Sequence, residues 1–175
     1  YYPMDTLGWN SSGYIHLLTE VERRAYADRA EHMGDPDFWD VPISMLTSKK
    51  YAKNRIKNIN PDIATPSSDI SASKKVLYET DETTHYSVVD RWGNAVSVTT
   101  TINLNYGNGC IVEGAGFFLN NEMDDFSSKP GVPNAFGLIG NEANAIEASK
   151  RPLSSMTPTI VLKGNKPFLV IGSPG

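Results

Sequence analysis

The sequence contains one cysteine, no long hydrophobic run and no excess of positive charge. Its cysteine, Cys110, excludes an internal disulfide, and no metal-ligand spacing surrounds it, so we interpret it as a packing residue. No apolar stretch approaches the ~20 residues that a membrane-spanning helix needs. With 16 lysines and arginines against 20 aspartates and glutamates, the net charge of −4 argues against a nucleic-acid-binding surface. The 175 residues are enough for one domain with a sizeable core.

Both ends of the sequence suggest a piece of a longer chain. It starts Tyr-Tyr-Pro, with neither an initiator methionine nor the basic stretch that opens a signal peptide. It stops directly after the apolar run 168–171 and a Gly-Ser-Pro-Gly segment. We therefore expect an excised or mature part of a larger fold.

A first helix is predicted over residues 14–33. Ser11 or Ser12 can cap it, because a serine hydroxyl accepts an otherwise unpaired backbone N–H. We expect an apolar buried face, with the charged residues mostly outside it, and we expect Gly34 to end the helix in a left-handed conformation. The apolar stripe is Tyr14, Leu17, Leu18, Val21 and Ala25, and the charged residues are Glu20, Arg23, Arg24 and Glu31.

A second helix is predicted over residues 49–59, with Ser48 as its cap. Five lysines and arginines crowd residues 49–57. They could bind a phosphate or an acidic partner, but such runs are usually solvated helix faces, and we favour that interpretation. His16 and His32, in or near the first helix, are interpreted as structural.

Beyond the helices the pattern changes from helical to extended. Residues 60–75 carry prolines and four serines, which indicates a flexible, exposed tether. From Thr83 the side chains alternate with a period of two, and a turn at 90–94 leads into residues 95–102. This pattern predicts an antiparallel hairpin.

Shorter extended segments and one long loop follow. One or two short strands, broken by Gly114 and Gly116, are expected within 111–119, and a second hairpin pairs 159–162 with 168–171 about Gly164-Asn165. Between them, residues 127–150 lack a strong pattern. Loops of this length inside compact domains are usually functional lids or disordered.

Thr83 is a candidate nucleophile at the start of the first predicted strand. A threonine hydroxyl is a weak nucleophile unless a base lies beside it. If the peptide bond before Thr83 were cut, the freed α-amine, with an ordinary pKa of about 7.7–8.0, would supply that base from the same residue. On spacing alone, a Thr-Thr pair that opens a strand is more often structural.

Four motifs, in the same order as in the family, resemble the small subunit of γ-glutamyltranspeptidases, also called glutathione hydrolases. They are Thr-Thr-His-Tyr-Ser at 83–87 followed by 90–96, Asn-Asn-Glu-Met-Asp-Asp-Phe at 120–126, Lys-Arg-Pro-Leu-Ser-Ser-Met at 150–156, and Gly-Ser-Pro-Gly at 172–175. A looser resemblance, through residues 26–29 and 34–37, is to the end of the family's large subunit.

The resemblance implies an α+β fold, the four-layer αββα sandwich of N-terminal-nucleophile hydrolases, present here as a fragment. Residues 1–82 would be the C-terminal part of the large subunit, with the tether over 60–82. Residues 83–175 would be the N-terminal part of the small subunit, with the catalytic sheet and the lid loop. We expect helices before Thr83 and antiparallel strands after it.

The resemblance also implies the catalytic residues. Autoproteolysis between Glu82 and Thr83 would free the Thr83 amine. Thr83 would then attack a γ-glutamyl amide and form an acyl-enzyme, which passes the acyl group to water, an amino acid or a peptide. Thr101 matches the family's second threonine, which orients the nucleophile. Gly175 matches the first of two glycines whose amides form the oxyanion hole.

Six further positions are implied for substrate binding. The substrate α-amino group would be bound by Asn103, Glu122 and Asp125, its α-carboxylate by Ser154 and Ser155, and the lid would carry Phe136. Carboxylates suit an ammonium group, although the acids at 122–125 could instead bind Ca²⁺; the segment lacks EF-hand spacing. Several bacterial members carry a tyrosine where Phe136 stands, and phenylalanine lacks the hydroxyl that holds the lid shut.

The implied substrates are glutathione and other γ-glutamyl compounds, with amino acids or peptides as acceptors. We expect no cofactor, no metal, no nucleic-acid partner, a processed heterodimer of large and small subunits, and a periplasmic or secreted location. Alternatives are a cephalosporin-acylase-like or poly-γ-glutamate-processing relative, an unprocessed fragment without activity, and a module that binds through its basic helix. The fragment itself is expected to turn over little substrate.

Overall fold

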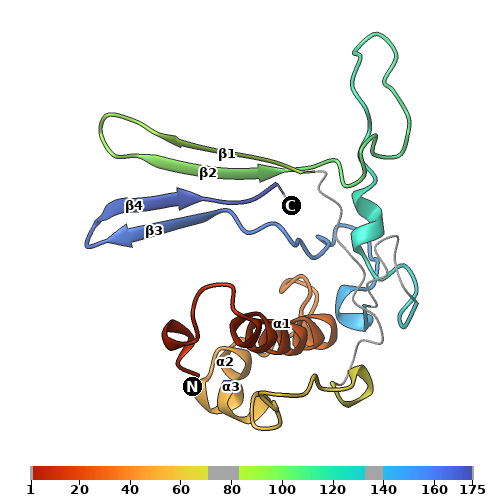
Figure 1. The fold of residues 1–175 in the computed structure, drawn as a ribbon. Helices are drawn as coiled ribbons and strands as arrows, with labels where there is room; N and C mark the ends of the chain where they lie inside the picture. Colours follow the sequence, from red (N-terminus) through yellow and green to blue (C-terminus); the bar gives the residue numbers. More distant parts are fainter. Residues whose placement is uncertain (1, 71–82, 133–139, 175) are drawn as a thin grey trace. The chain divides into compact units, whose positions relative to one another are not determined.

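A computed structural model describes residues 2–70, 83–132 and 140–174 and divides the chain into two compact units (Figure 1). The first unit comprises Tyr1–Leu77 and Phe126–Leu153, and the second comprises Tyr78–Asp125 and Ser154–Gly175. The first unit thus combines residues from both sides of the expected cleavage point. The division of the chain at that point into two subunit parts stays a prediction.

The first unit is helical. It contains α1 (Ser12–His32), α2 (Ile43–Leu46) and α3 (Lys49–Arg55), with the 3₁₀ turns η1 (Met4–Thr6), η2 (Ser67–Asp69) and η4 (Glu142–Asn144). Serine caps start two of the helices: the Ser11 hydroxyl accepts the Tyr14 N–H at 3.2 Å, and the Ser48 hydroxyl accepts the Tyr51 N–H at 3.1 Å. Over the described ranges, no helix combines the length and apolar character that a membrane crossing requires.

Both predicted helices are therefore present, and the second ends earlier than expected, at Arg55. After this helix the chain continues in turns that are closed by hydrogen bonds between residues three positions apart, and these turns lead to the buried Ile59. The lysines of α3 are exposed, as expected of a solvated face, whereas Arg55 pairs with Asp28 at 2.9 Å. His16 has a structural contact, because its Nε2 lies 2.8 Å from the carbonyl oxygen of Asn60.

The buried face of α1 differs from the predicted apolar stripe. It consists of Leu17, Glu20, Arg24 and Ala27, whereas two members of the predicted stripe, Leu18 and Val21, are more than a third exposed. The expectation that charged residues lie outside the buried face was wrong for Glu20 and Arg24. The reason lies in the partners that the rest of the unit supplies to these two charges.

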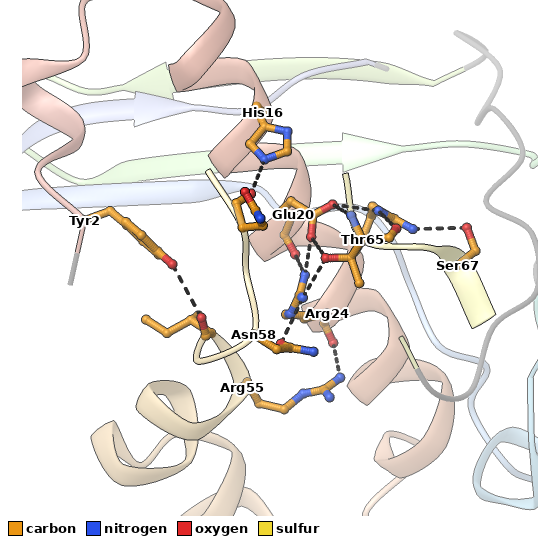
Figure 2. A network of polar contacts seen from close by, with 11 residues as sticks. Tyr2, His16, Glu20, Arg24, Arg55, Asn58, Thr65 and Ser67 are labelled. Carbon is orange, nitrogen blue, oxygen red and sulfur yellow. Dashed lines mark hydrogen bonds and ion pairs between the residues drawn. The ribbon is translucent and has the colours of Figure 1, made fainter. Parts of the chain in front are cut away.

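Every oxygen of the buried Glu20 carboxylate has donors (Figure 2). Arg23 and Arg24 each donate at 2.7 Å, and Thr65 donates through its backbone N–H at 3.1 Å and through its hydroxyl at 2.5 Å. Arg24 continues to the Asn58 side chain at 3.0 Å. Burial alone would raise the pKa of Glu20, but the hydrogen bonds from Thr65 and Arg24 outweigh it and lower that pKa to about 2. The charged network therefore fastens the segment after α3 to α1.

Gly34, just beyond α1, is required for a different reason than predicted. Its backbone is not left-handed; the helix closes instead at Met33, which is extended with φ −97° and ψ 139°. A Cβ atom on Gly34 would lie 2.0 Å from the carbonyl oxygen of Ala143. Only glycine lets the two backbones approach this closely.

The second unit is built on two antiparallel hairpins, β1 (Thr84–Val89) with β2 (Ala95–Thr100) and β3 (Thr159–Lys163) with β4 (Lys166–Ile171). They lie side by side in Figure 1, and the Ser97 hydroxyl donates to the Ile171 carbonyl at 3.1 Å. In the first turn, the Asp90 carboxylate accepts the N–H groups of Trp92 and Asn94, both at 2.9 Å. Both predicted hairpins are confirmed.

The strands predicted within 111–119 are absent from the structure, where an isolated bridge joins Ile111 to Phe118. Gly114 and Gly116 have φ values of +79° and +75°, and a strand cannot continue through backbone of this kind. In the described parts of 127–150, a single parallel bridge joins Ser127 to Ala145, and these parts contain no strand. The lid residue Phe136 lies outside the described residues.

The α+β fold class is confirmed: helices precede Thr83 and antiparallel strands follow it. In the part of the chain that the structure describes, the buried apolar side chains all belong to the first unit; they are Leu17, Ala27, Ile59, Ile70, Phe126 and Ala143. The hairpins of the second unit instead carry exposed valines and aromatics on their faces.

Candidate active site

Thr83 directly precedes β1 and is half-buried. Its backbone N–H donates to the carbonyl oxygen of Pro174 at 3.2 Å. The nitrogen that cleavage would convert into an amine is thus already held beside the Gly-Ser-Pro segment that follows β4. Glu82, on the other side of the expected cleavage point, and Gly175, the expected oxyanion donor, both lie outside the described residues.

Thr83 directly precedes β1 and Thr101 directly follows β2, so both threonines lie at the open end of the first hairpin. The last pair of the register is Thr84 with Thr100, and each threonine lies one residue beyond it. The hairpin therefore places two threonines that are eighteen positions apart in the sequence at the same end of its strands. A contact between their hydroxyl groups stays a prediction.

Asn103 is buried and held in a strained backbone conformation, with φ +77°. Its N–H donates to the Thr101 hydroxyl oxygen at 2.9 Å, and its side-chain amide donates to the Asn121 carbonyl at 3.1 Å. The Asn121 N–H in turn donates to the Ile102 carbonyl at 3.2 Å. The second threonine is thereby tied to the residue that immediately precedes Glu122.

Glu122 and Asp125 lie on the 3₁₀ turn η3 (Glu122–Asp125), which the Asn120 side chain caps by accepting the Glu122 N–H at 3.0 Å. Burial raises the pKa of Glu122, and a hydrogen bond to Asp125 and the charge of Asp125 raise it further, to about 7. A positive charge placed beside Glu122 would favour its ionised form. A substrate ammonium would supply that charge and release the proton.

Ser154 and Ser155 precede β3 and are exposed. The Ser154 hydroxyl oxygen accepts the Met156 N–H at 3.1 Å, so a local turn fixes the side chain while its own proton stays available for donation. The structure places this pair in the same unit as Thr83, Thr101, Asn103 and Glu122. Their convergence on one substrate stays a prediction.

Sequence reasoning missed the contact that joins the two hairpins beside Thr83. The His85 ring lies between two hydroxyls, with Nδ1 2.8 Å from Thr99 Oγ1 and Nε2 3.0 Å from Ser87 Oγ. A Cβ atom on Gly172 would lie 2.4 Å from ring atoms of His85. The glycine of the Gly-Ser-Pro motif therefore gives room for the ring. A contact of this kind, between residues far apart in the chain, leaves no signal in a single sequence.

Comparisons with known proteins identify the family of the chain. The family model described as gamma-glutamyltranspeptidase matches residues 1–175. The glutathione hydrolase proenzyme of Escherichia coli (strain K12) is 52% identical over 174 residues, which is 99% of this chain and 30% of that protein. The glutathione hydrolase proenzyme of Pseudomonas aeruginosa is 53% identical over 166 residues, 95% of this chain and 29% of that protein.

A solved structure of a Helicobacter pylori γ-glutamyltranspeptidase mutant is 75% identical over the aligned part, with a TM-score of 0.48, and covers 50% of this chain and 47% of that one. The match to the family model extends over the whole chain. The chain belongs to the γ-glutamyltranspeptidase family. It spans about 30% of the length of the curated relatives it matches.

Proposed function

We propose that this chain carries the nucleophile and part of the substrate site of a self-cleaving γ-glutamyltransferase that also acts as a glutathione hydrolase. The observation that carries the proposal is the placement of Thr83. It directly precedes β1, lies at the end of the hairpin where Thr101 follows β2, and has its nitrogen held by the Pro174 carbonyl. Membership of the family, and similarity to relatives that are named glutathione hydrolase proenzymes, support the same proposal.

Activation begins with cleavage of the bond between Glu82 and Thr83. The Thr83 hydroxyl oxygen attacks the Glu82 carbonyl carbon, the C–N bond breaks, and the acyl group passes from nitrogen to oxygen. Water then hydrolyses the ester, which frees the hydroxyl and leaves the Glu82 carboxylate. The new α-amine keeps a donor for the Pro174 carbonyl, and this hydrogen bond orients its lone pair toward its own hydroxyl.

In turnover the amine accepts the hydroxyl proton while Oγ attacks the γ-glutamyl amide. The amine proton then passes to the leaving nitrogen, and the product is an ester on Thr83. Water or the amine of an acceptor amino acid or peptide attacks this ester, and the hydroxyl recovers its proton. Thr101 orients the nucleophile, and the backbone amide of Gly175 stabilises the tetrahedral oxyanion.

The substrate is selected by residues that bind the free α-ammonium and α-carboxylate groups of an amino acid. The Glu122–Asp125 pair, with its raised pKa, binds the α-ammonium together with Asn103, and the two serines at 154 and 155 donate to the α-carboxylate. Glutathione and other γ-glutamyl compounds carry such a head. After cleavage the two products stay together as a heterodimer, in the periplasm or outside the cell.

Residues 1–175 span only part of the length of the relatives. Residues that position the substrate and stabilise the oxyanion act as a unit, so the loss of some of them removes most of the catalytic effect of the others. We infer that these residues on their own show little γ-glutamyl transfer. We infer full turnover for the protein produced from its own gene.

The test compares Thr83→Ala, Thr83→Ser and, as a matched control, Thr84→Ala in the protein produced from its own gene. The alanine variant at 83 should neither split nor turn over a γ-glutamyl anilide, the serine variant should keep part of both activities, and the variant at 84 should split. Splitting of the Thr83→Ala chain between 82 and 83 would show that the nucleophile lies elsewhere. A cephalosporin-type amide, run in parallel, separates the acylase-like alternative.

A further inference from the structure

The first compact unit is assembled from both sides of the proposed cleavage point. Residues that precede Glu82 contribute the end of α1, and residues that follow Thr83 contribute the segment 126–153. Contacts at one place join the two sides: the Asn141 amide donates to the Glu31 carboxylate at 2.5 Å, Gly34 abuts the Ala143 carbonyl, and Arg151 pairs with Asp35. We call this place the α1 joint.

The Asp35 carboxylate is the most completely enclosed charge of the α1 joint. Its side chain is 1% exposed, and Arg151 reaches it with its guanidinium from the solvent side. Arg151 donates to Asp35 through its backbone N–H at 2.9 Å, through Nε at 2.8 Å and through a guanidinium NH₂ group. The hydrogen bonds from Arg151 hold the pKa of Asp35 well below its usual range, although burial opposes them.

The part that follows Thr83 holds its own shape where it meets α1. The Asn144 side chain accepts the Leu153 N–H at 3.1 Å, and the Asn144 carbonyl accepts the Ser127 N–H at 2.9 Å. Asn144 is buried, and neither bond involves a residue before position 83. These bonds hold residues 127, 144 and 153 together within the segment that carries Arg151.

If the segment left, the Asp35 carboxylate would lose every donor that Arg151 supplies and keep the Asp37 N–H at 3.1 Å. Asp37 also meets the Arg151 guanidinium, but its side chain is 73% exposed and water can replace that contact. Leaving a buried carboxylate without its partner is strongly unfavourable, because the ion must either recover water or take up a proton. Asp35 and Asp37 therefore carry the same charge, one in a buried and one in an exposed position.

We propose that the Asp35–Arg151 ion pair is the latch that keeps residues before the cleavage point attached to residues after it once the chain has been cut. Its occupant is the segment 126–153 of the chain's own second piece. This inference rests on the proposed self-cleavage, because an uncut chain has no need of a latch. It assigns a role in subunit retention to residues that touch neither the nucleophile nor the substrate groups.

The experiment makes the cut independently of Thr83. A recognition sequence for a site-specific protease is inserted after Ser73 in a Thr83→Ala chain that carries an affinity tag at its N-terminus. After cutting, release of the second piece from the immobilised first piece gives the dissociation constant. The parent chain is compared with Asp35→Asn and with the control Asp37→Asn. The mass of a chain that lacks the insert and keeps Thr83 is measured separately by mass spectrometry. This measurement tests self-cleavage alone.

We expect Asp35→Asn to weaken the association of the pieces by roughly tenfold or more and Asp37→Asn by less than about threefold. Equal release by the two variants, or parent pieces that separate at once, would overturn the proposal. If uncut Asp35→Asn fails to fold, Arg151→Lys replaces it, since lysine keeps the charge and loses the two-pronged geometry. Association of Arg151→Lys as tight as that of the parent would then overturn the latch.

Discussion

Substitution of Asp125 by asparagine should lower the pKa of Glu122 and shift substrate binding to lower pH. The Glu122 carboxyl titrates near pH 7 because it is buried and because the Asp125 carboxylate both bonds to it and repels its negative charge. Asparagine removes that charge but leaves the burial. The pKa of Glu122 should therefore fall from about 7 but stay above its ordinary value of 4.5.

The magnitude follows from the pKa. A carboxyl with a pKa of about 7 is about nine-tenths protonated at pH 6 and about one-tenth protonated at pH 8. If the ionised form binds the substrate ammonium, KM for a γ-glutamyl anilide should fall several-fold across this interval. Because the folded pKa exceeds the unfolded one, the stabilising contribution is complete below pH 4.5 and is lost as the pH rises toward 7. Solvent screening of this half-buried pair reduces that loss to about 1–2 kcal/mol.

The direct assay is a carbon-13 NMR titration of glutamate carboxyls in the chain, with Glu122→Gln used to assign the resonance. The parent should show one glutamate that titrates near pH 7, and Asp125→Asn should move that resonance to lower pH. Asp124→Asn is the matched control, since it removes a neighbouring charge that does not contribute to the Glu122 shift. A Glu122 resonance that titrates near 4.5 in the parent would refute the reasoning.

Three further predictions concern binding and stability. Replacing Ser154 and Ser155 together by alanine should raise KM by roughly 10–100-fold while mass spectrometry still finds the chain split, because their partner is a substrate carboxylate; equal loss of splitting would make the pair structural. Glu20→Gln should lower the unfolding free energy by about 3–5 kcal/mol in urea, since two arginines lose a buried partner, and an unchanged midpoint would contradict the network. Gly34→Ala should destabilise by about 1–3 kcal/mol, because its methyl group meets the Ala143 backbone, and a neutral result in thermal melting would mean that the backbones separate freely.

The sequence predicted those parts of the fold that depend on interactions between residues close together in the chain. The serine caps of α1 and α3, and the period-two alternation around a turn closed by Asp90, depend on residues within a few positions of one another. Such features are legible in one sequence. At 111–119 the apolar run predicted short strands broken by two glycines, but the left-handed backbone of both glycines leaves an isolated bridge and no strand there.

Buried charge was the main feature that the sequence could not disclose. Glu20 and Arg24, four positions apart on a helix, look like an exposed surface pair. They are buried because Asn58 and Thr65 return to them from another part of the chain. Asp35 likewise acquires its partner from a residue 116 positions away.

For the candidate site, the residues themselves gave only a threonine before a strand. The placement of Thr83 and Thr101 at the same end of the first hairpin follows from its register and could be predicted once the turn was placed. Substrate roles came from resemblance to the family. The contact of His85 with Gly172 required the second hairpin to be placed beside the first, which no local pattern does.

The most direct test of the central claim is to trap the nucleophile in the protein purified from its natural source. The protein is incubated with an electrophilic γ-glutamyl analogue, and its pieces are then sequenced from their N-termini and mapped by peptide mass. We predict a piece that begins at Thr83 and carries the adduct on that residue. An adduct on any other residue, or an uncut chain that is nonetheless active and labelled, would contradict the account.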